Sequence, residues 1–253
     1  MILKKGLIKK DKKMELYKAH DFCASGEAKL TVIMIHGIAT DSSSYSKALT
    51  YLEGTTSMKD VRFIAFDLLG AGKSLTSDKL EYNFSEQLSA LESSIKKLDL
   101  KTPVVLVGHS MGTMILARYL ANHKRGIKKV ILLSPPIYRK EEIEHPAFKQ
   151  AMEGFFAYVK QKSADTLKAK YFTNAIDNIV LNKNNYGFFE KISKPTVMIY
   201  GEEDTFIAPH NIVAVAKVNP NIDICCTPCG HSISHEKYTK VLNILEGIIN
   251  ETV

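Results

Sequence analysis

The stretch that decides the fold runs VVLVGHSMGTMILARYL, from Val104 to Leu120. Its first residues are apolar at nearly every position, which is typical of a strand buried on both faces. The residues from Met111 onward form a longer segment of helical character. Gly108-His109-Ser110-Met111-Gly112 lies where the strand gives way to the helix, and it fits the pattern G-x-S-x-G. The stretch therefore predicts a strand, a sharp turn centred on Ser110, and a helix.

Ser110 is the candidate nucleophile. A direct turn from strand to helix forces its backbone into a strained conformation, and Gly108 and Gly112 let the neighbouring backbones pass without a Cβ clash. The hydroxyl of Ser110 is then expected at the carboxyl end of the sheet, beside the positive end of the following helix. The alternative is an ordinary turn that carries a surface serine.

Short apolar, β-branched runs alternate with longer amphipathic segments on both sides of this stretch. That alternation indicates an α/β fold, with a mostly parallel sheet and crossover helices. Strands are predicted at Leu30–Ile35, Val61–Asp67, Val104–Gly108, Val130–Ser134, Thr196–Tyr200 and Ile222–Cys226. Helices are predicted at Ser44–Leu52, Ser85–Leu98, Met111–His123, His210–Val218 and His235–Ile249. The first 22 residues have room for one or two antiparallel edge strands.

The alternation is interrupted between Ile137 and Phe189, where the segments look helical and none resembles a strand. The chain has 11 Phe and 11 Tyr residues, and ten of these 22 lie in this interval. The sequence therefore predicts a first core part (1–136), a small helical cap (137–189) and a second core part (190–253). Large rings in a small insertion can serve packing alone. The alternative is that some of them, Phe155 and Phe156 first, also roof a narrow apolar pocket above Ser110.

A serine hydroxyl is a poor nucleophile unless a base takes its proton, and the base needs an acid to orient it. Tyr200-Gly201-Glu202-Glu203-Asp204 follows one predicted strand and Gly230-His231 follows the last one, so both segments belong at the same edge of the sheet as Ser110. His231 is the candidate base because it lies on a loop, whereas the competing His235 is expected to open the final helix. Asp204 is the candidate acid, with Glu203 and Glu202 as alternatives.

Five landmarks follow one another along the chain. They are Ile35-His36-Gly37, the turn Asp67-Leu68-Leu69-Gly70-Ala71-Gly72-Lys73-Ser74, Gly108 to Gly112, Gly201 to Asp204, and Gly230-His231. Together they resemble the α/β-hydrolase superfamily in its serine esterase and lipase branch, which includes monoacylglycerol-lipase-like members. The resemblance covers nearly all of the chain apart from the cap. It implies the α/β-hydrolase fold and an oxyanion hole made by the backbone N–H groups of Ile38 and Met111, with His36 and His109 as structural neighbours.

At two places the sequence departs from the pattern of particular α/β-hydrolase groups. Ile38-Ala39-Thr40 follows His36-Gly37 in place of the glycine-rich run of some esterase groups. Ser134-Pro135-Pro136 stands where some relatives carry the acid of the triad.

The combined pattern predicts a hydrolase that cleaves carboxylic esters through an acyl-enzyme, with Ser110, His231 and Asp204 as its triad. The expected substrate is a small-molecule ester of short-to-medium acyl or aromatic type, and the reaction requires no metal or organic cofactor. The same triad would also serve a thioesterase, an amidase, a lactonase, a C–C bond hydrolase or a perhydrolase. A ligand sensor that turns over slowly is the alternative from another functional class.

Composition argues against several other classes. The 253 residues carry a formal net charge of +7, but much of this excess lies in a short basic start and no nucleic-acid-binding motif accompanies it. No apolar run approaches the roughly 20 residues of a membrane span. Because the N-terminus is also too charged for a secretory signal, the expected location is cytoplasmic. The oligomeric state is left open.

The cysteines raise the question of a metal site. Cys225, Cys226 and Cys229 lie near His231 and His235 in sequence. However, Cys225 and Cys226 point to opposite faces of a predicted strand, and a second pair of ligands at finger-like spacing is missing. Free thiols are therefore expected, with no metal.

Overall fold

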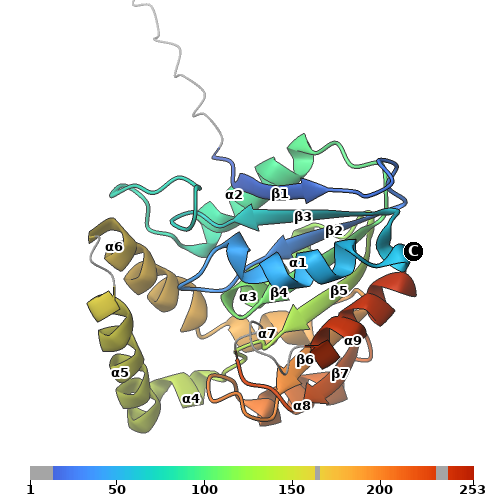
Figure 1. Cartoon of the computed structure of the whole chain (residues 1–253). Helices are drawn as coiled ribbons and strands as arrows, with labels where there is room; N and C mark the ends of the chain where they lie inside the picture. The colour runs from blue at the N-terminus through green and yellow to red at the C-terminus, as the bar shows by residue number, and fades with distance from the viewer. Residues whose placement is uncertain (1–13, 163–165, 232–238) are drawn as a thin grey trace, which may run out of the picture.

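A seven-stranded sheet forms the centre of the molecule in a computed structural model that describes residues 14–162, 166–231 and 239–253. The strand order is β1-β3-β2-β4-β5-β6-β7 (Figure 1). β1 runs antiparallel to β3, and all the other pairs are parallel. This confirms the predicted α/β class. The strands are β1 (Tyr17–Phe22), β2 (Leu30–Ile35), β3 (Val61–Asp67), β4 (Val104–His109), β5 (Ile127–Leu133), β6 (Thr196–Gly201) and β7 (Ile222–Thr227).

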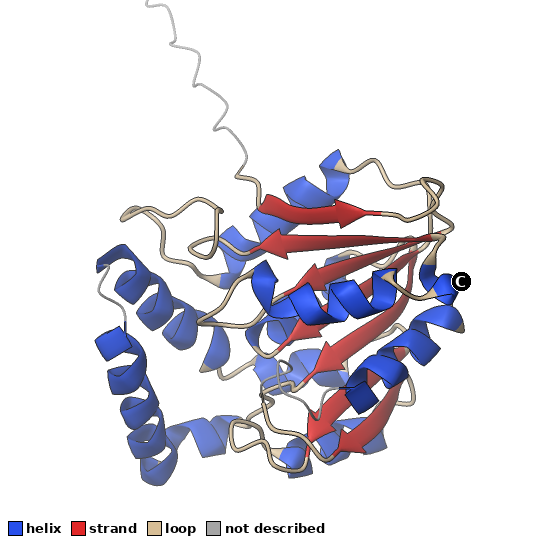
Figure 2. Ribbon diagram, viewed as in Figure 1, coloured by secondary structure: helices blue, strands red, loops and turns tan. Residues whose placement is uncertain are grey.

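Helices cover both faces of the sheet (Figure 2). One face packs against α1 (Ser46–Glu53) and α9 (Thr239–Asn250). The opposite face packs against α2 (Phe84–Lys97), α3 (Met111–Asn122) and α8 (Pro209–Val218). Two short 3₁₀ turns, η1 (Ser42–Tyr45) and η2 (Thr56–Met58), flank α1.

The side chains of β2 show why its sequence is continuously apolar. Ile33 and Ile35 are buried in the layer that contains α3, whereas Val32 and Met34 are buried in the layer that contains α1. Because neighbouring side chains of a strand point to opposite faces, a strand covered on both faces must be apolar at every position.

The interval predicted as a cap lies between β5 and β6 and is helical in the part that the structure describes. It contains α4 (Lys140–Glu144), α5 (Pro146–Lys162), α6 (Thr166–Ala175), a single π-helical turn η3 (Ile176–Val180), and α7 (Asn185–Glu190). In Figure 1, α4, α5 and α6 form an arch on the side toward which β2 and β3 point. The division of the chain into core and cap stays a prediction.

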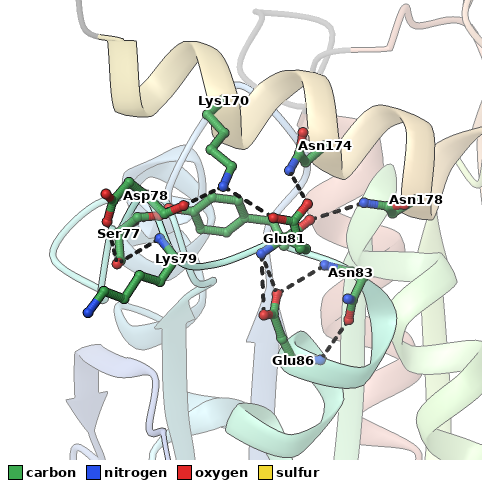
Figure 3. A network of polar contacts seen from close by, with 10 residues as sticks. Ser77, Asp78, Lys79, Glu81, Asn83, Glu86, Lys170, Asn174 and Asn178 are labelled. Atoms are coloured by element: carbon green, nitrogen blue, oxygen red, sulfur yellow. Dashed lines mark hydrogen bonds and ion pairs between the residues drawn. The ribbon is translucent and has the colours of Figure 1, made fainter.

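A polar network fixes α6 to the loop before α2 (Figure 3). The carboxylate of Glu81 accepts hydrogen bonds from Lys170 Nζ at 3.2 Å and Asn174 Nδ2 at 3.0 Å. The backbone carbonyl of Glu81 accepts another from Asn178 Nδ2 at 3.1 Å. These three donors recur every four residues, so they share one face of the helical segment. Next to them Tyr171 is buried, with its ring centroid 5.2 Å from that of Tyr82.

Some element boundaries differ from the prediction where the backbone leaves regular geometry. β5 begins at Ile127, before the predicted start at Val130. It ends at Leu133 instead of Ser134, because Ser134 has a φ of +48° and cannot continue a strand. The helix predicted from Ser44 instead opens with the 3₁₀ turn η1 before α1 begins.

Two expectations fall partly outside the described residues. Of the possible strands in the first 22 residues, the described part contains β1. The predicted start of the last helix at His235 lies outside the described residues. Within the described ranges, no helix is both long enough and apolar enough to span a bilayer.

Candidate active site

Ser110 occupies the sharp turn between β4 and α3. Its φ of 49° and ψ of −120° lie outside the regions that residues with a side chain normally adopt, as expected for a strained turn. Gly112 permits this turn, because a Cβ at that position would lie 2.3 Å from the carbonyl oxygen of Ile35. Gly108 is packed less tightly, since a Cβ there would lie 2.9 Å from Leu116 Cδ1 and 3.0 Å from the backbone of Gly112. Gly108 and Gly112, the two glycines predicted to flank the turn, thus both lie where a side chain has no room.

The structure brings Ser110, His231 and Asp204 together from three separate loops. His231 Nε2 lies 2.9 Å from Ser110 Oγ, and His231 Nδ1 lies 2.8 Å from Asp204 Oδ2. A carboxylate can only accept, so Nδ1 donates to Asp204 and Nε2 is left to accept the proton of Ser110. The second carboxylate oxygen of Asp204 accepts from the backbone N–H of Phe206 at 2.9 Å. Both oxygens of this buried acid are therefore bound.

The loops that carry the candidate acid, Asp204, and the candidate base, His231, run side by side. The backbone N–H groups of Glu202 and Glu203 donate to the carbonyl oxygens of Thr227 and Cys229, at 2.9 and 3.1 Å. These bonds continue the β6–β7 ladder past Gly201, the last residue of β6. The side chains of Glu202 and Glu203, the alternative acids, are exposed, and Asp204 is the acid in contact with His231.

Gly37 and Met111 flank Ser110 on the side predicted for the oxyanion hole. A Cβ on Gly37 would lie 3.0 Å from Ser110 Cβ, so the loop after β2 passes directly against Ser110. Met111 is the first residue of α3, where helix N–H groups have no intrahelical partner. Among the described residues, neither the N–H of Ile38 nor that of Met111 donates a hydrogen bond to another protein atom. Both groups remain predicted oxyanion donors.

Both ring nitrogens of His36 are bonded to backbone groups, which is typical of a structural histidine. Its Nδ1 lies 2.7 Å from the carbonyl oxygen of Gly37, and its Nε2 lies 2.9 Å from the N–H of Leu68. The carbonyl requires a donor and the N–H requires an acceptor, so the ring is neutral with its proton on Nδ1. Complete burial lowers the pKa of His36, which favours the same neutral form.

A mostly apolar cavity of about 190 Å³ opens beside Ser110. The core contributes Ile38, Ala39, Pro136, Phe206 and the two rings of His109 and His231 to its wall. The predicted cap interval contributes Tyr138, Met152, Ile176 and Val180. The side chains of Phe155 and Phe156, predicted for this pocket, lie outside the described part of the structure. The cap residues seen in the wall are mainly aliphatic, and Tyr138 is the aromatic one among them.

Sequence reasoning missed six of these wall residues, namely Ala39, Pro136, Met152, Ile176, Val180 and Phe206. In the sequence, Ile176 and Val180 look like ordinary apolar positions of a helix. The π-helical turn that contains them has no clear sequence signal. Phe206 follows Asp204 by two residues, and its ring centroid lies 5.2 Å from that of His231. Met152 stands in α5 close in sequence to the two predicted phenylalanines. Tyr138 is one of the ten rings in the interval, but the sequence did not single it out as a pocket residue.

The cysteines do not form a metal site in the part of the chain that the structure describes. No group of three or more His, Cys, Asp or Glu side chains converges there as metal ligands would. Cys225 and Cys229 are partly buried, Cys226 is exposed, and all four cysteines are free thiols. His235, the remaining candidate ligand, lies outside the described residues.

Known proteins resemble this chain in sequence and in structure. A family model described as "alpha/beta hydrolase fold" matches residues 31–180, more than half of the chain. The chain is 34% identical over 122 residues to the probable lysophospholipase BODYGUARD 2 of Arabidopsis thaliana, a match that covers 48% of this chain and 26% of that protein. The chain thus spans about a quarter of the length of this curated relative and of two similar ones.

Solved structures are similar over nearly the full length. A carboxylesterase from Nitrososphaera gargenis superposes with a TM-score of 0.74 at 17% identity, covering 97% of this chain and 98% of that one. A monoacylglycerol lipase from Paleococcus ferrophilus superposes with a TM-score of 0.67 at 20% identity, covering 95% and 100%. At these identities the similarity is one of fold.

Proposed function

Since this chain belongs to the α/β-hydrolase family, we propose that it is a serine hydrolase of carboxylic esters with short-to-medium acyl or aromatic groups. Ser110 is the proposed nucleophile, His231 the base and Asp204 the acid that orients it. The observation that carries the proposal is the hydrogen-bonded series Asp204–His231–Ser110, which borders an apolar cavity of about 190 Å³.

Acylation begins when His231 Nε2 takes the proton of Ser110 while Oγ attacks the carbonyl carbon of the ester. Asp204 keeps the proton on Nδ1, so that Nε2 presents its lone pair, and its charge stabilises the imidazolium that forms. The N–H groups of Ile38 and Met111 are the proposed donors to the negative oxygen of the tetrahedral intermediate. One such donor lowers the barrier by about 3–4 kcal/mol in comparable sites.

The intermediate collapses when the C–O bond to the leaving group breaks and His231 returns its proton to the departing alcohol. A water molecule then enters, gives a proton to His231 Nε2 and attacks the acyl carbon. The second tetrahedral intermediate releases the carboxylic acid as Ser110 Oγ regains its proton. Every proton in this cycle passes through one nitrogen, which is why the orientation of the ring matters.

The volume of the cavity supports the acyl length proposed. An apolar protein cavity of about 150 Å³ accommodates benzene, which has six carbons. In the same proportion, a cavity of about 190 Å³ holds roughly seven or eight carbons. Most of the cavity wall is apolar, so the acyl group that enters the cavity is expected to be apolar as well.

A panel of p-nitrophenyl esters and acyl thioesters of graded length, run beside a Ser110→Ala control, tests the proposal. We expect repeated turnover of the esters, with the highest kcat/KM between about four and eight acyl carbons. A faster reaction with every thioester than with the matching ester would assign a thioesterase instead. Product formation that stops near one equivalent of enzyme would assign the slow-turnover sensor.

A further inference from the structure

His109, the residue before the nucleophile, makes one contact that the reaction scheme leaves unused. Its Nε2 lies 2.9 Å from the backbone carbonyl oxygen of His231, 122 residues further along the chain. The side chain is 8% exposed. Because a carbonyl oxygen can only accept, Nε2 of His109 must carry the proton and donate it to this contact.

The other ring nitrogen of His109 shows that the ring cannot act as a second base. Among the described residues, Nδ1 is buried and has no hydrogen-bond partner. A Cβ on Gly37 would lie 3.1 Å from it, so the α-carbon of Gly37 covers this side of the ring. Burial lowers the pKa of His109 to about 3, as expected for a ring whose second nitrogen would have no acceptor if protonated. The ring is a neutral, single donor with a fixed tautomer.

The contact constrains the part of His231 that Asp204 does not reach. Asp204 bonds to the ring of His231 and limits its rotation, but this bond does not fix the position of the main chain of His231. Before His231, the base loop is held by the bond from Glu203 to Cys229. The bond from His109 to the carbonyl oxygen of His231 is a further point of attachment, on the main chain of the base itself.

We propose that His109 is a positioning residue that holds the main chain of His231 in register with Ser110. The proposal rests on the function proposed above. His109 and Ser110 are consecutive, so the hydrogen bond ties the base to the backbone of the nucleophile itself. Two fixed points then define the base: the carbonyl held by His109 sets the direction of the Cα–Cβ bond, and Asp204 sets the rotation of the ring. Together they keep Nε2 at 2.9 Å from Ser110 Oγ.

Two substitutions separate the hydrogen bond from the packing. His109→Phe keeps a flat ring of similar size but has no donor, whereas His109→Gln keeps an N–H donor without the ring. Misplacing a reacting group by about 1 Å can cost about 100-fold in rate. We expect His109→Phe to lower kcat on p-nitrophenyl butyrate by roughly 10- to 100-fold, and His109→Gln to recover most of that loss.

A histidine elsewhere in the chain provides a matched control. His123 also contacts a backbone carbonyl, since its Nδ1 lies 3.1 Å from the oxygen of Tyr119, but it stands at the far end of α3 from Ser110. His123→Phe should leave kcat unchanged. A folded His109→Phe protein with the original kcat would overturn the proposal. So would a His109→Gln protein as slow as His109→Phe, because the ring and not its donor would then be what matters.

A second readout separates this proposal from the function on which it rests. The rate at which a fluorophosphonate labels Ser110 requires the base but no ester turnover. If the unmodified protein is labelled but cleaves no ester, the ester assignment fails and labelling rates of the two variants still decide the positioning role. If it is neither labelled nor active, crystal structures decide. An unchanged distance from His231 Nε2 to Ser110 Oγ in His109→Phe would then reject the role, and a lengthened one would support it.

Discussion

The hydroxyl of Tyr138 donates a hydrogen bond to the carbonyl oxygen of Phe206, two residues beyond Asp204. Tyr138 follows β5 at the start of the interval predicted as a cap, so this bond joins that interval to the loop that carries the acid. Burial raises the pKa of the Tyr138 hydroxyl above its usual range, which keeps it a neutral donor. The same ring lines the cavity beside Ser110.

Removing this hydroxyl should loosen the acid loop. For Tyr138→Phe we expect a loss of about 1 kcal/mol in the free energy of unfolding, since the hydrogen bond from the hydroxyl to the carbonyl of Phe206 is lost. We also expect a severalfold lower kcat, because Asp204 would hold His231 less firmly. Urea denaturation and steady-state kinetics measure the two effects. If stability falls but kcat does not, the bond stabilises the loop without orienting the acid.

A fluorophosphonate probe should label Ser110 covalently in the intact protein. Ser110→Ala should lose both the label and any ester hydrolysis, because it removes the oxygen that attacks. Intact mass spectrometry before and after treatment gives the stoichiometry, and peptide mapping gives the position. Labelling that persists in Ser110→Ala would remove Ser110 from the proposed role.

The acid can be tested by one amide substitution and its neighbour. Asp204→Asn should keep the protein folded while allowing the wrong tautomer of His231, and the matching change in a serine protease lowers kcat by about 10⁴. Glu203→Gln is the control, because its side chain is exposed and Asp204 is the acid bonded to His231. The reverse pattern, with Glu203→Gln the damaging change, would move the acid by one residue.

Enlarging the cavity should move the preferred acyl length upward. Val180→Ala and Ile176→Val each remove methyl groups from the wall. Each further methylene that becomes buried contributes up to about 0.8 kcal/mol, or about fourfold in kcat/KM. The ratio of kcat/KM for octanoate and butyrate esters measures the shift. Val215→Ala, a buried valine of α8 outside the wall, should lower stability without changing this ratio.

Two buried histidines should make the fold sensitive to acid. Burial lowers the pKa of His109 to about 3 and also lowers the pKa of His36, so below the ordinary value of about 6.5 the unfolded chain binds protons that the folded chain does not. The free energy of unfolding should therefore fall as pH drops below about 6.5, and for His109 this fall should continue toward pH 3 at up to about 1.4 kcal/mol per pH unit. The lowered pKa of His36 acts in the same direction. Urea denaturation at several pH values measures this slope, and His109→Gln should reduce it. An equal slope in the variant would contradict the assignment to His109.

The elements that the sequence predicted best are those whose signal is local. A continuously apolar strand, two glycines around a serine, and loops that follow strands are readable from neighbouring residues, and they led to Ser110, His231 and Asp204. Their proximity follows from topology, because parallel strands end at one edge of the sheet. The structure then supplies the distances that no pattern contains.

The cavity wall could not be read in the same way. Ile176 and Val180 face the cavity through a π-helical turn, which depends on tertiary packing rather than on residue type. The aromatic residues of the interval divide between roles: Tyr171 and Phe189 are buried in the core, whereas Tyr138 lines the cavity. The amino-acid composition gives the number of aromatic rings but not the direction in which each ring points. The role of His109 was also out of reach, because its partner is a backbone atom 122 residues away.

The close approach of Gly201 to Cys229 sets a limit on how this protein can diverge. A Cβ at position 201 would lie 1.9 Å from the carbonyl oxygen of Cys229, so even alanine would push the acid loop away from the base loop. The spacing between the two loops is thus set by main chain against main chain. Exposed side chains on these loops, such as that of Glu202, can change in size and charge while the distances among Asp204, His231 and Ser110 stay constant. The outer surface of the loops can therefore change readily, whereas Gly201 cannot.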